Sequence, residues 1–444
     1  MRKLIAVVFP TLCFSAAHAA EDVEKDFVED THLTLDLRNF YAEQRTLEGS
    51  SLSIAKGTGK ELTSRRTTWV QGAMLNLVTG WTPGLVAAGF DASFFGATLL
   101  ERGKGRVAGG GDRVPVQNDG TPVDDWGHLG VADARVRVKG TELKAGRFSL
   151  NTPVLWPKDN RAIPPTFQGV HLKSTDIPGM NAQVAWFDRV LGRTSSNADR
   201  FVSTYGNPKY HGDSLFIAGV DTLPWHSVTG SLYFNRYENA WDRYHAGLTS
   251  VGKFGAWGSQ TKLAYYSTHD QGSRQLGYID NSSASISQTL TFGPHLISAG
   301  YQQVFGNEFF DYPQETVGNY NPVQYYSDFN GPNEKAAMIR YGLDMAPFGA
   351  PGLGFTTWYA KGWDIDGTHY EGDRNGAHLG YGVRSLDGAS HWEVGMGVKY
   401  VVQSGALKNV TLRPAWYHHR ARGGQVDGNY DEWRLVTTVP IKLF

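Results

Sequence analysis

Apolar and polar residues alternate along much of the chain with a period of two, the period of side chains on a β-strand. The first clear case is residues 31–38, where leucines occupy positions 33, 35 and 37 and polar residues occupy positions 34, 36 and 38. Such a strand meets an apolar medium on one face and water on the other.

Similar segments, separated by turn residues, continue to the C-terminus. They predict strands over 69–78, 85–100, 131–139, 143–148, 171–174, 181–189, 214–223, 228–237, 244–249, 260–267, 283–292, 296–305, 336–345, 354–360, 376–383, 391–403, 410–419 and 432–444. Short turns alternate with long polar loops, as in a transmembrane β-barrel. At roughly ten residues per strand plus connections, the chain has room for about 16 to 20 strands. We therefore predict an all-β protein, a single antiparallel barrel over residues 20–444.

Residues 131–169 contain the strand with the most charge. One face of this strand carries Asp133, Arg135, Arg137 and Lys139, and we assign the valines at positions 131, 136 and 138 to the other face. The proline-rich stretch 151–165 follows, and it can form neither a helix nor a central strand. This pattern predicts a charged inner wall with a long loop folded back over it, which together form a constriction.

The N-terminus has the three parts of a secretory signal peptide. Arg2 and Lys3 precede a short apolar run, and residues 17–19 (Ala-His-Ala) fit a small-residue cleavage site. We expect cleavage after residue 19. Cys13 is the only cysteine and lies within this segment, so the exported chain forms no disulfide.

Composition supports a membrane barrel and disfavours other classes. The chain contains 53 Gly and many aromatic residues, which suit tight turns and interfacial girdles. A net charge of −1 gives no reason to expect a nucleic-acid partner. No apolar run after the signal approaches the length of a helical span. A soluble β-propeller would show a repeat of roughly 40–50 residues, and none is visible.

Cations recur on strand faces opposite apolar rows. They are Arg38, Arg340, Lys399, Arg413 and Arg434, in addition to the charged residues near position 135. Three cations on the lipid face of one strand would cost roughly 6–12 kcal/mol, so they must face a wet lumen. Two interpretations remain open. The cations belong to a hydrated wall balanced by acidic loops, or they form a row along which a carboxylate passes.

Several motifs resemble those of the OprD-like (Occ) family of substrate-specific outer-membrane porins. They include 37–41 (Leu-Arg-Asn-Phe-Tyr), 80–84 (Gly-Trp-Thr-Pro-Gly), 162–169 (Ala-Ile-Pro-Pro-Thr-Phe-Gln-Gly) and 400–405 (Tyr-Val-Val-Gln-Ser-Gly). The resemblance covers nearly the whole mature chain. It implies 18 strands, a third loop folded inward, a monomer in the bacterial outer membrane, and uptake of small solutes, commonly carboxylates such as aromatic acids or amino acids.

The resemblance also implies site residues. The basic ladder would comprise Arg38, Arg135, Arg137, Arg340, Lys399, Arg413 and Arg434; the third loop would add Asp159, Asn160 and Arg161; and Asp280 would lie near the constriction. Trp358 and Ala415 stand where the family often has arginine, which thins the ladder. The phase of Trp358 places it in the lumen, where an aromatic ring can stack on a sugar. A chito-oligosaccharide porin is therefore the alternative within the family.

Motifs for other chemistry are absent or weak. Residues 57–61 lack the spacing of a P-loop, and no Gly-x-Ser-x-Gly occurs. His418 and His419 point to opposite faces of a strand, so they cannot chelate a metal as a pair. We expect no cofactor, no metal and no catalytic residue. The expected partners are the solute and outer-membrane lipid or lipopolysaccharide, and the different-class alternative is an outer-membrane β-barrel hydrolase.

Overall fold

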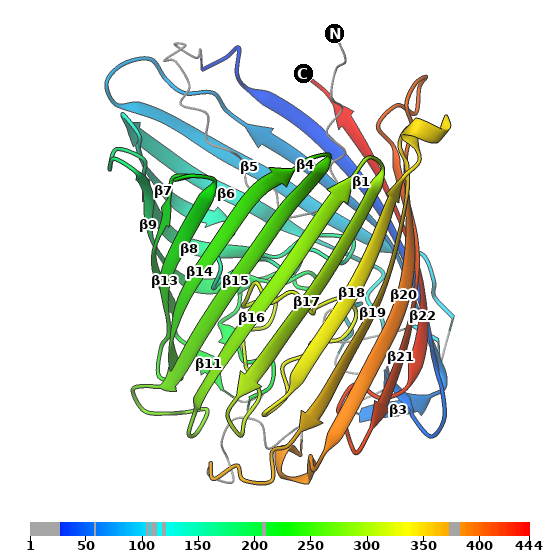
Figure 1. The fold of residues 1–444 in the computed structure, drawn as a ribbon. Helices are drawn as coiled ribbons and strands as arrows, with labels where there is room; N and C mark the ends of the chain where they lie inside the picture. Colours follow the sequence, from blue (N-terminus) through cyan, green and yellow to red (C-terminus); the bar gives the residue numbers. More distant parts are fainter. Residues whose placement is uncertain are drawn as a thin grey trace.

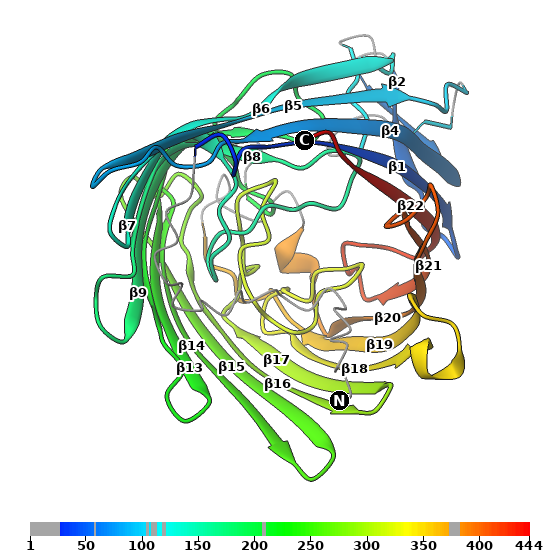
Figure 2. The ribbon, with the colours of Figure 1, turned by 90° about the horizontal axis from the view of Figure 1, so that it is seen from above.

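The computed structural model describes residues 27–56, 59–103, 106–107, 113–117, 121–206, 210–372 and 382–444. Within them, one 18-stranded antiparallel sheet closes into a barrel (Figure 1). Each wall strand pairs with the next along the chain, and the last strand pairs with the first, which closes the ring seen in Figure 2. The predicted strand number is confirmed. The predicted signal peptide, residues 1–19, lies outside the described residues.

The wall consists of β1 (His32–Thr46), β4 (Arg65–Val78), β5 (Ala87–Leu99), β6 (Asp125–Val138), β7 (Thr141–Phe148), β8 (Thr166–Ser174), β9 (Met180–Leu191), β12 (Leu215–Thr222), β13 (Val228–Tyr237), β14 (Trp241–Phe254), β15 (Trp257–Asp270), β16 (Asp280–Phe292), β17 (His295–Phe305), β18 (Lys335–Asp344), β19 (Leu353–Ile365), β20 (Ala389–Val401), β21 (Thr411–Arg422) and β22 (Tyr430–Lys442). Two small hairpins stand apart from it: β2 (Leu52–Lys56) with β3 (Gly59–Thr63), and β10 (Phe201–Val202) with β11 (His211–Gly212). The short 3₁₀ helices are η1 (Ala346–Phe348) and η3 (Val383–Ser385). In the described part of the chain, no helix has the length and hydropathy to cross a bilayer.

The two rims of the barrel differ in their connections. One rim, where the C-terminus lies in Figure 1, carries tight turns such as 139–140 and 293–294. The other rim carries long segments, including 149–165, 192–214 and 306–334. We call these the short-turn end and the long-loop end. In outer-membrane barrels they correspond to the periplasmic and extracellular sides.

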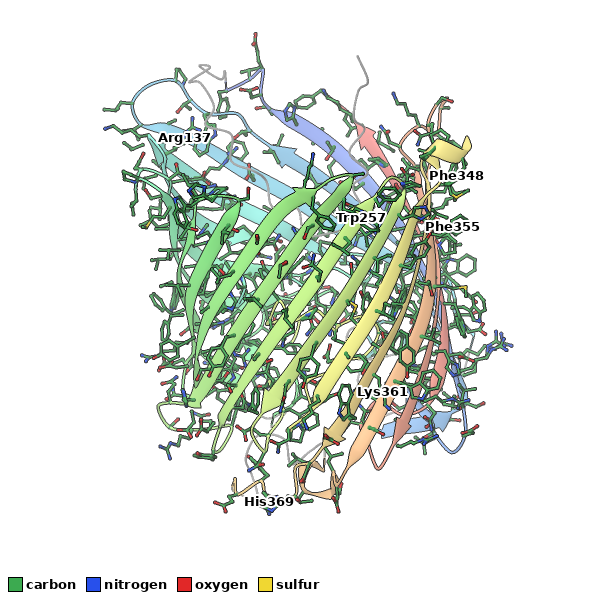
Figure 3. All side chains as sticks on the ribbon, viewed as in Figure 1. Arg137, Trp257, Phe348, Phe355, Lys361 and His369 are labelled. Atoms are coloured by element: carbon green, nitrogen blue, oxygen red, sulfur yellow. The ribbon has the colours of Figure 1, made fainter. Side chains whose placement is uncertain are left out.

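The outer face of the wall is apolar. Exposed side chains include Leu129, Val136, Leu248, Leu263, Ile286 and Ile339. Aromatic rings gather at the short-turn end, where Trp257 lies 4.9 Å from Phe292 between ring centroids and is stacked on it. Figure 3 shows Trp257, Phe348 and Phe355 at this level. Such a belt marks the boundary between hydrocarbon and head groups.

A β-bulge in β6 changes which side chains face inward. Ser93 of β5 pairs with Val131, but the next residue, Phe94, pairs with Leu129, so Gly130 is the additional residue. Val131 lies after the bulge and two residues before Asp133, so it shares the inner face with Asp133, and it packs against a buried interior cluster. The prediction that Val131 shares the outer face with the valines at 136 and 138 is therefore wrong.

The loop between β7 and β8, residues 149–165, folds into the barrel, as predicted for the third loop. Ala162 and Ile163 are buried in a cluster with Phe40 of β1 and Met74 of β4. The loop approaches the wall closely at Gly72, because a Cβ atom there would collide with the carbonyl oxygen of Ala162. Glycine at this position lets the loop lie against the wall.

Gly72→Ala is expected to push this loop towards the pore axis at a cost of about 1–3 kcal/mol, because the added methyl group overlaps backbone atoms. Single-channel conductance in a planar bilayer should change measurably. Gly342→Ala is the matched control, since a Cβ there meets Leu296 at 3.5 Å and the carbonyl oxygen of Phe355 at 3.8 Å, both ordinary contact distances. Equal conductance of the Gly72→Ala variant and the wild type would show that the loop position does not limit the current.

A second loop, residues 306–334, also occupies the interior, and the sequence pattern did not predict it. Tyr266 of β15 joins the two loops: its hydroxyl donates to the carbonyl of Pro153 (2.9 Å) and accepts from the backbone N–H of Tyr320 (2.8 Å). Arg243 of β14 anchors the second loop and is fully buried, with its guanidinium 3.9 Å from the ring centroid of Phe310. Both loops therefore narrow the lumen.

The described end of one predicted strand, residues 382–383 of 376–383, is not part of the wall. Residues 376–381 lie outside the described residues, while Gly382 has a φ of 59° and Val383 begins η3. The wall passes from β19 directly to β20. Val383 is instead buried in a loop cluster with Tyr205 and Phe309, so its apolar side chain serves loop packing and not the lipid face.

Candidate functional site

The first part of the site is a contact between the β1 wall and the third loop. Arg38 points inward and forms an ion pair with the carboxylate of Asp159. Its guanidinium also donates to the backbone carbonyl of Arg161 (2.9 Å). Arg193 donates to the side chain of Asn160, and it forms a 2.7 Å ion pair with Glu315 of the second loop. The predicted loop residues 159–161 therefore lie where the third loop meets the β1 wall, and Arg193 links Asn160 to the second loop.

Further cations surround this contact. Arg434 of β22 donates to the carboxylate of Glu432 (2.8 Å), and its guanidinium lies 4.8 Å from the ring centroid of Tyr417. Arg161 and Arg434 each lie 5.6 Å from the ring of Phe40. Arg413 faces the same lumen, and among the described residues no carboxylate lies within ion-pair distance of it.

Arg135 and Arg137 lie on the inner face of β6 near the short-turn end, where Figure 3 shows Arg137. Their guanidinium carbons lie 4.3 and 4.5 Å from the ring centroid of Trp81. Arg135 also forms a 3.2 Å ion pair with Asp91. Lys399 lies on the inner face of β20, likewise towards the short-turn end. These positions agree with the predicted inward face.

Two predicted site residues do not face the lumen. Lys139 is exposed in the turn after β6, with a φ of 54°, because the strand ends at Val138. Asp280 begins β16 on the outer face, where it lies 3.0 Å from His269 of the neighbouring strand. The inward residue at that point is Asn281, which donates to the carbonyl of Phe309 (3.1 Å).

Trp358 faces inward, as its phase predicted, but a loop covers it. Its ring stacks on Tyr325 of the second loop at 4.9 Å between centroids, and its indole N–H donates to Glu393 (3.0 Å). Only 7% of its surface is exposed. Trp358 therefore supports the loop that lines the lumen, whereas Tyr325 and Tyr320 contribute to the lining.

The inner wall and the second loop enclose a polar cavity of about 340 Å³. Two cations line it, Lys262 of β15 and Arg340 of β18. The other lining residues include Trp156, Gln260, Ser287, Thr289, Ser298, Asn319, Tyr320, Asn321 and Tyr325. Arg340 donates to the hydroxyl of Ser298 (3.3 Å), and its buried Nε has no hydrogen-bond partner. In the described part of the chain, neither cation has a carboxylate partner.

Lys262 was missed by the sequence interpretation, although a signal was present. It alternates with Leu263 and Tyr265, which are exposed on the outer face. The strand was predicted, but its cation was not assigned to the row. Lys262 and Arg340 form a pair of positive charges that face one cavity without an acidic counterpart, an arrangement suited to an anion.

The comparisons with known proteins agree with this architecture. The family model described as outer membrane porin, OprD family, matches residues 25–443. Porin D of Pseudomonas aeruginosa is 32% identical over 437 residues, which cover 94% of this chain and 92% of the relative. This chain belongs to the OprD family of outer membrane porins.

Solved structures extend the likeness of this OprD-family porin. The crystal structure of Pseudomonas aeruginosa OccD3 (OpdP) aligns with a TM-score of 0.81 and 37% identity, covering 94% of this chain and 93% of that one. The structure of Pseudomonas aeruginosa OpdK with vanillate aligns with a TM-score of 0.81 and 25% identity, covering 94% and 100%. The family consists of channels of the Gram-negative outer membrane, so this OprD-family porin is a channel for small solutes and not a hydrolase.

A buried carboxyl makes the second loop of this porin sensitive to pH. Glu308 is 2% exposed and accepts the backbone N–H of Asp280 (2.6 Å). Burial raises the pKa of Glu308 from its ordinary 4.5 to about 7, against the opposing effect of that hydrogen bond. The folded state therefore binds the proton of the Glu308 carboxyl more tightly than the unfolded state does. The stability that this proton contributes is fully present below about pH 4.5 and is lost as the pH rises through about 7.

Glu308→Gln is expected to reduce the loss of stability between about pH 5 and pH 8, because glutamine stays neutral throughout. The thermal unfolding midpoints of the wild type and the variant, measured at both pH values, test this. If the unfolding midpoint of the wild type falls no further between the two pH values than that of Glu308→Gln, the raised pKa of Glu308 is contradicted.

Proposed function

We propose that this porin mediates passive, selective diffusion of small carboxylate-containing solutes, such as aromatic acids or amino acids, along its lumenal cations. The observation that carries the proposal is the pair Lys262 and Arg340, which faces the polar cavity without a carboxylate partner in the described structure. A solute carboxylate would supply the missing negative charge.

The energetics favour binding that remains reversible. A carboxylate 4 Å from one cation gains about 4 kcal/mol at an effective dielectric near 20, and only about 1 kcal/mol in bulk water. Asp159 and Glu432 already partner Arg38 and Arg434, which weakens the field at the constriction. Conduction requires attraction strong enough to admit a solute and weak enough to release it. Paired and unpaired cations in series meet this requirement.

A relative provides further support. The solved structure of Pseudomonas aeruginosa OpdK, 25% identical to this chain, contains vanillate. Vanillate is an aromatic carboxylate, the class of solute that the cavity here would attract. Both its ring and its charge have counterparts in this cavity, because Trp156 and Tyr320 lie on the lining beside the two cations.

The same aromatic residues favour a second candidate, a chito-oligosaccharide. The rings of Trp156 and Tyr320 meet edge to face with centroids 5.4 Å apart, and Tyr325 lines the same cavity. Aromatic faces suit the apolar faces of sugar rings, and the hydroxyl-bearing side chains nearby suit sugar hydroxyls. A neutral sugar, however, would only accept hydrogen bonds from the two cations and would not neutralise their charge.

The experiment is single-channel recording in a planar bilayer, with benzoate in one run and a chito-oligosaccharide in the other. Block by benzoate and an anion-selective reversal potential would support the proposal. Block by the sugar alone would move the function to oligosaccharide uptake. If neither solute blocks the current and the channel shows no ion preference, the cations belong to a hydrated lumen wall and do not bind a solute.

The proposal includes the form in which the protein works. We propose that residues 1–19 are removed during export, that the barrel functions as a monomer, and that outer-membrane lipid or lipopolysaccharide contacts its outer face. The single chain closes its own barrel, and that face is apolar. Intact mass and light scattering of the purified protein test the first two points; a mass that includes residues 1–19 or a trimer would refute them.

A further inference from the structure

Two histidines from neighbouring strands meet inside the barrel at its long-loop end. His391 comes from β20 and His419 from β21, and the rings are 1% and 0% exposed. Their nearest nitrogens, Nδ1 of His391 and Nε2 of His419, are 2.9 Å apart. Figure 1 shows β20 and β21 side by side near this end. The pair plays no part in the cation row described above.

Each ring uses its other nitrogen to donate a proton. Nε2 of His391 lies 2.7 Å from the carboxylate of Glu334. Nδ1 of His419 lies 2.7 Å from the carbonyl oxygen of Gly428, which can only accept. When both rings are neutral, they therefore turn lone pairs towards each other across 2.9 Å. Such an arrangement repels unless a cation lies between the nitrogens.

Acidic and hydroxyl groups surround the two facing nitrogens. A carboxylate oxygen of Asp427 lies 4.0 Å from Nδ1 of His391, and the three candidate ligand atoms all lie within 4.8 Å of one another. The hydroxyl of Ser327 is 3.3 Å from Nδ1 of His391. Glu334 and Glu393 are both 1% exposed. Within the described ranges, no lysine or arginine forms an ion pair with any of these three carboxylates.

We propose that this cluster binds a divalent transition-metal ion of the zinc class, with Nδ1 of His391, Nε2 of His419 and a carboxylate oxygen of Asp427 as ligands. Zinc takes imidazole and carboxylate ligands at about 2.0–2.2 Å in a tetrahedron, which places two ligand nitrogens about 3.3 Å apart. The rings need to separate by only a few tenths of an ångström. The hydrogen bonds to Glu334 and Gly428 are the outer contacts that typically fix the tautomer of metal-bound histidines.

The ion would connect parts of the chain that are distant in sequence. Asp427 belongs to the loop between β21 and β22, and its carboxylate accepts from the Ser327 hydroxyl of the second loop. Glu334 ends that second loop. A metal ion here would connect the second loop and the β21–β22 loop to strands β20 and β21 of the wall. The adjacent pair at 418–419 could not do so, because His418 points away from His419 and contacts Asp431 at 2.6 Å.

Zinc binding to the purified, tag-free, chelator-treated porin tests the proposal. ZnCl₂ is titrated by calorimetry, and bound zinc is counted after desalting. We expect about one zinc ion per chain. His419→Gln should abolish this binding, and Glu334→Gln, which keeps all three ligands, should weaken it by about 10–100-fold. His418→Gln is the matched control, one residue away on the opposite face, and should bind zinc as the wild type does.

Three results would overturn the proposal: no zinc on the wild-type chain, undiminished binding by both His419→Gln and Glu334→Gln, or equal loss in His418→Gln. A shared proton between the rings would give the first result. Heat-modifiable migration on a gel confirms that each variant retains its barrel. If His419→Gln fails to fold, Asp427→Asn takes its place in the comparison, because it removes a ligand that lies in a loop and not in the wall.

Discussion

Replacing both Lys262 and Arg340 with glutamine is expected to weaken benzoate block by about 100-fold or more. A hydrogen bond to a charged group contributes about 1.5–3 kcal/mol, and each 1.4 kcal/mol is a factor of ten in affinity. Both side chains line the 340 Å³ cavity, and neither has a carboxylate partner in the described structure. Their replacement therefore leaves no buried carboxylate without an ion-pair partner. The blocking constant from single-channel recordings measures the effect.

The matched control removes two lysines from the outside of the same barrel. Lys335 and Lys361 lie on the outer face of β18 and β19 near the long-loop end, where Figure 3 shows Lys361. Lys335→Gln with Lys361→Gln changes the net charge by the same amount as the lumenal pair and should leave block within a few fold. Equal block in the wild type and the lumenal double variant would refute the role of the cavity as a carboxylate site.

Arg243→Met is expected to release the second loop and to raise single-channel conductance while the barrel stays closed. Arg243 is fully buried and donates to the carbonyl of Asp311 (2.6 Å) and the hydroxyl of Thr268 (3.0 Å). Its guanidinium also lies against the rings of Trp241 and Phe310. A third, longer hydrogen bond runs to the carbonyl of Gly318 (3.4 Å). Loss of the two shorter bonds alone should cost about 3–6 kcal/mol, on the scale of 1.5–3 kcal/mol for each bond to a charged group.

Conductance and the thermal unfolding midpoint check this second expectation. Arg236→Met on the adjacent strand is the control, because Arg236 pairs with Asp242 at 2.8 Å with 44% of its side chain exposed. An exposed pair contributes about 0–1 kcal/mol. A conductance in Arg243→Met that matches both the control and the wild type would mean that other contacts hold the loop in place.

Local alternation was enough to predict the wall and the direction of its cations. Arg38, Arg340 and Arg413 each alternate with apolar residues, and each faces the lumen as predicted. The period of two is a property of any extended strand, so it needs no knowledge of neighbouring strands. For the same reason, the segments that alternate most clearly predicted the barrel, whereas the number of 18 strands came from the family resemblance.

Errors occurred mainly where a strand begins or ends. Lys139 lies one residue beyond the end of β6, and Asp280 is the first residue of β16. The bulge at Gly130 reverses the phase only of the residues before it, whereas Val131 has the same parity as Asp133, so plain alternation already puts Val131 on the inner face. A one-residue change reverses the face of every side chain beyond it. Alternation alone cannot locate such changes, because turn geometry and pairing with the next strand determine them.

Contacts across long sequence distances could not be predicted. The second loop, residues 306–334, has prolines at positions 313, 322 and 332, but nothing in its sequence shows that it shares the interior with the third loop. The burial of Trp358 depends on Tyr325 of that loop, and the contact of His391 with His419 depends on how β20 pairs with β21. These arrangements follow from strand register and loop packing, which a single sequence does not reveal.

The position of the polar cavity along the barrel gives the channel a direction. Lys262 and Arg340 lie closer to the short-turn rim than to the long-loop rim, and the second loop bounds their cavity. An anion that arrives from the short-turn mouth meets the two cations early, whereas one from the other mouth first passes both loops. The two mouths are therefore electrically unequal, and the sign of the applied voltage at which a charged blocker acts would report which way the barrel sits in the bilayer.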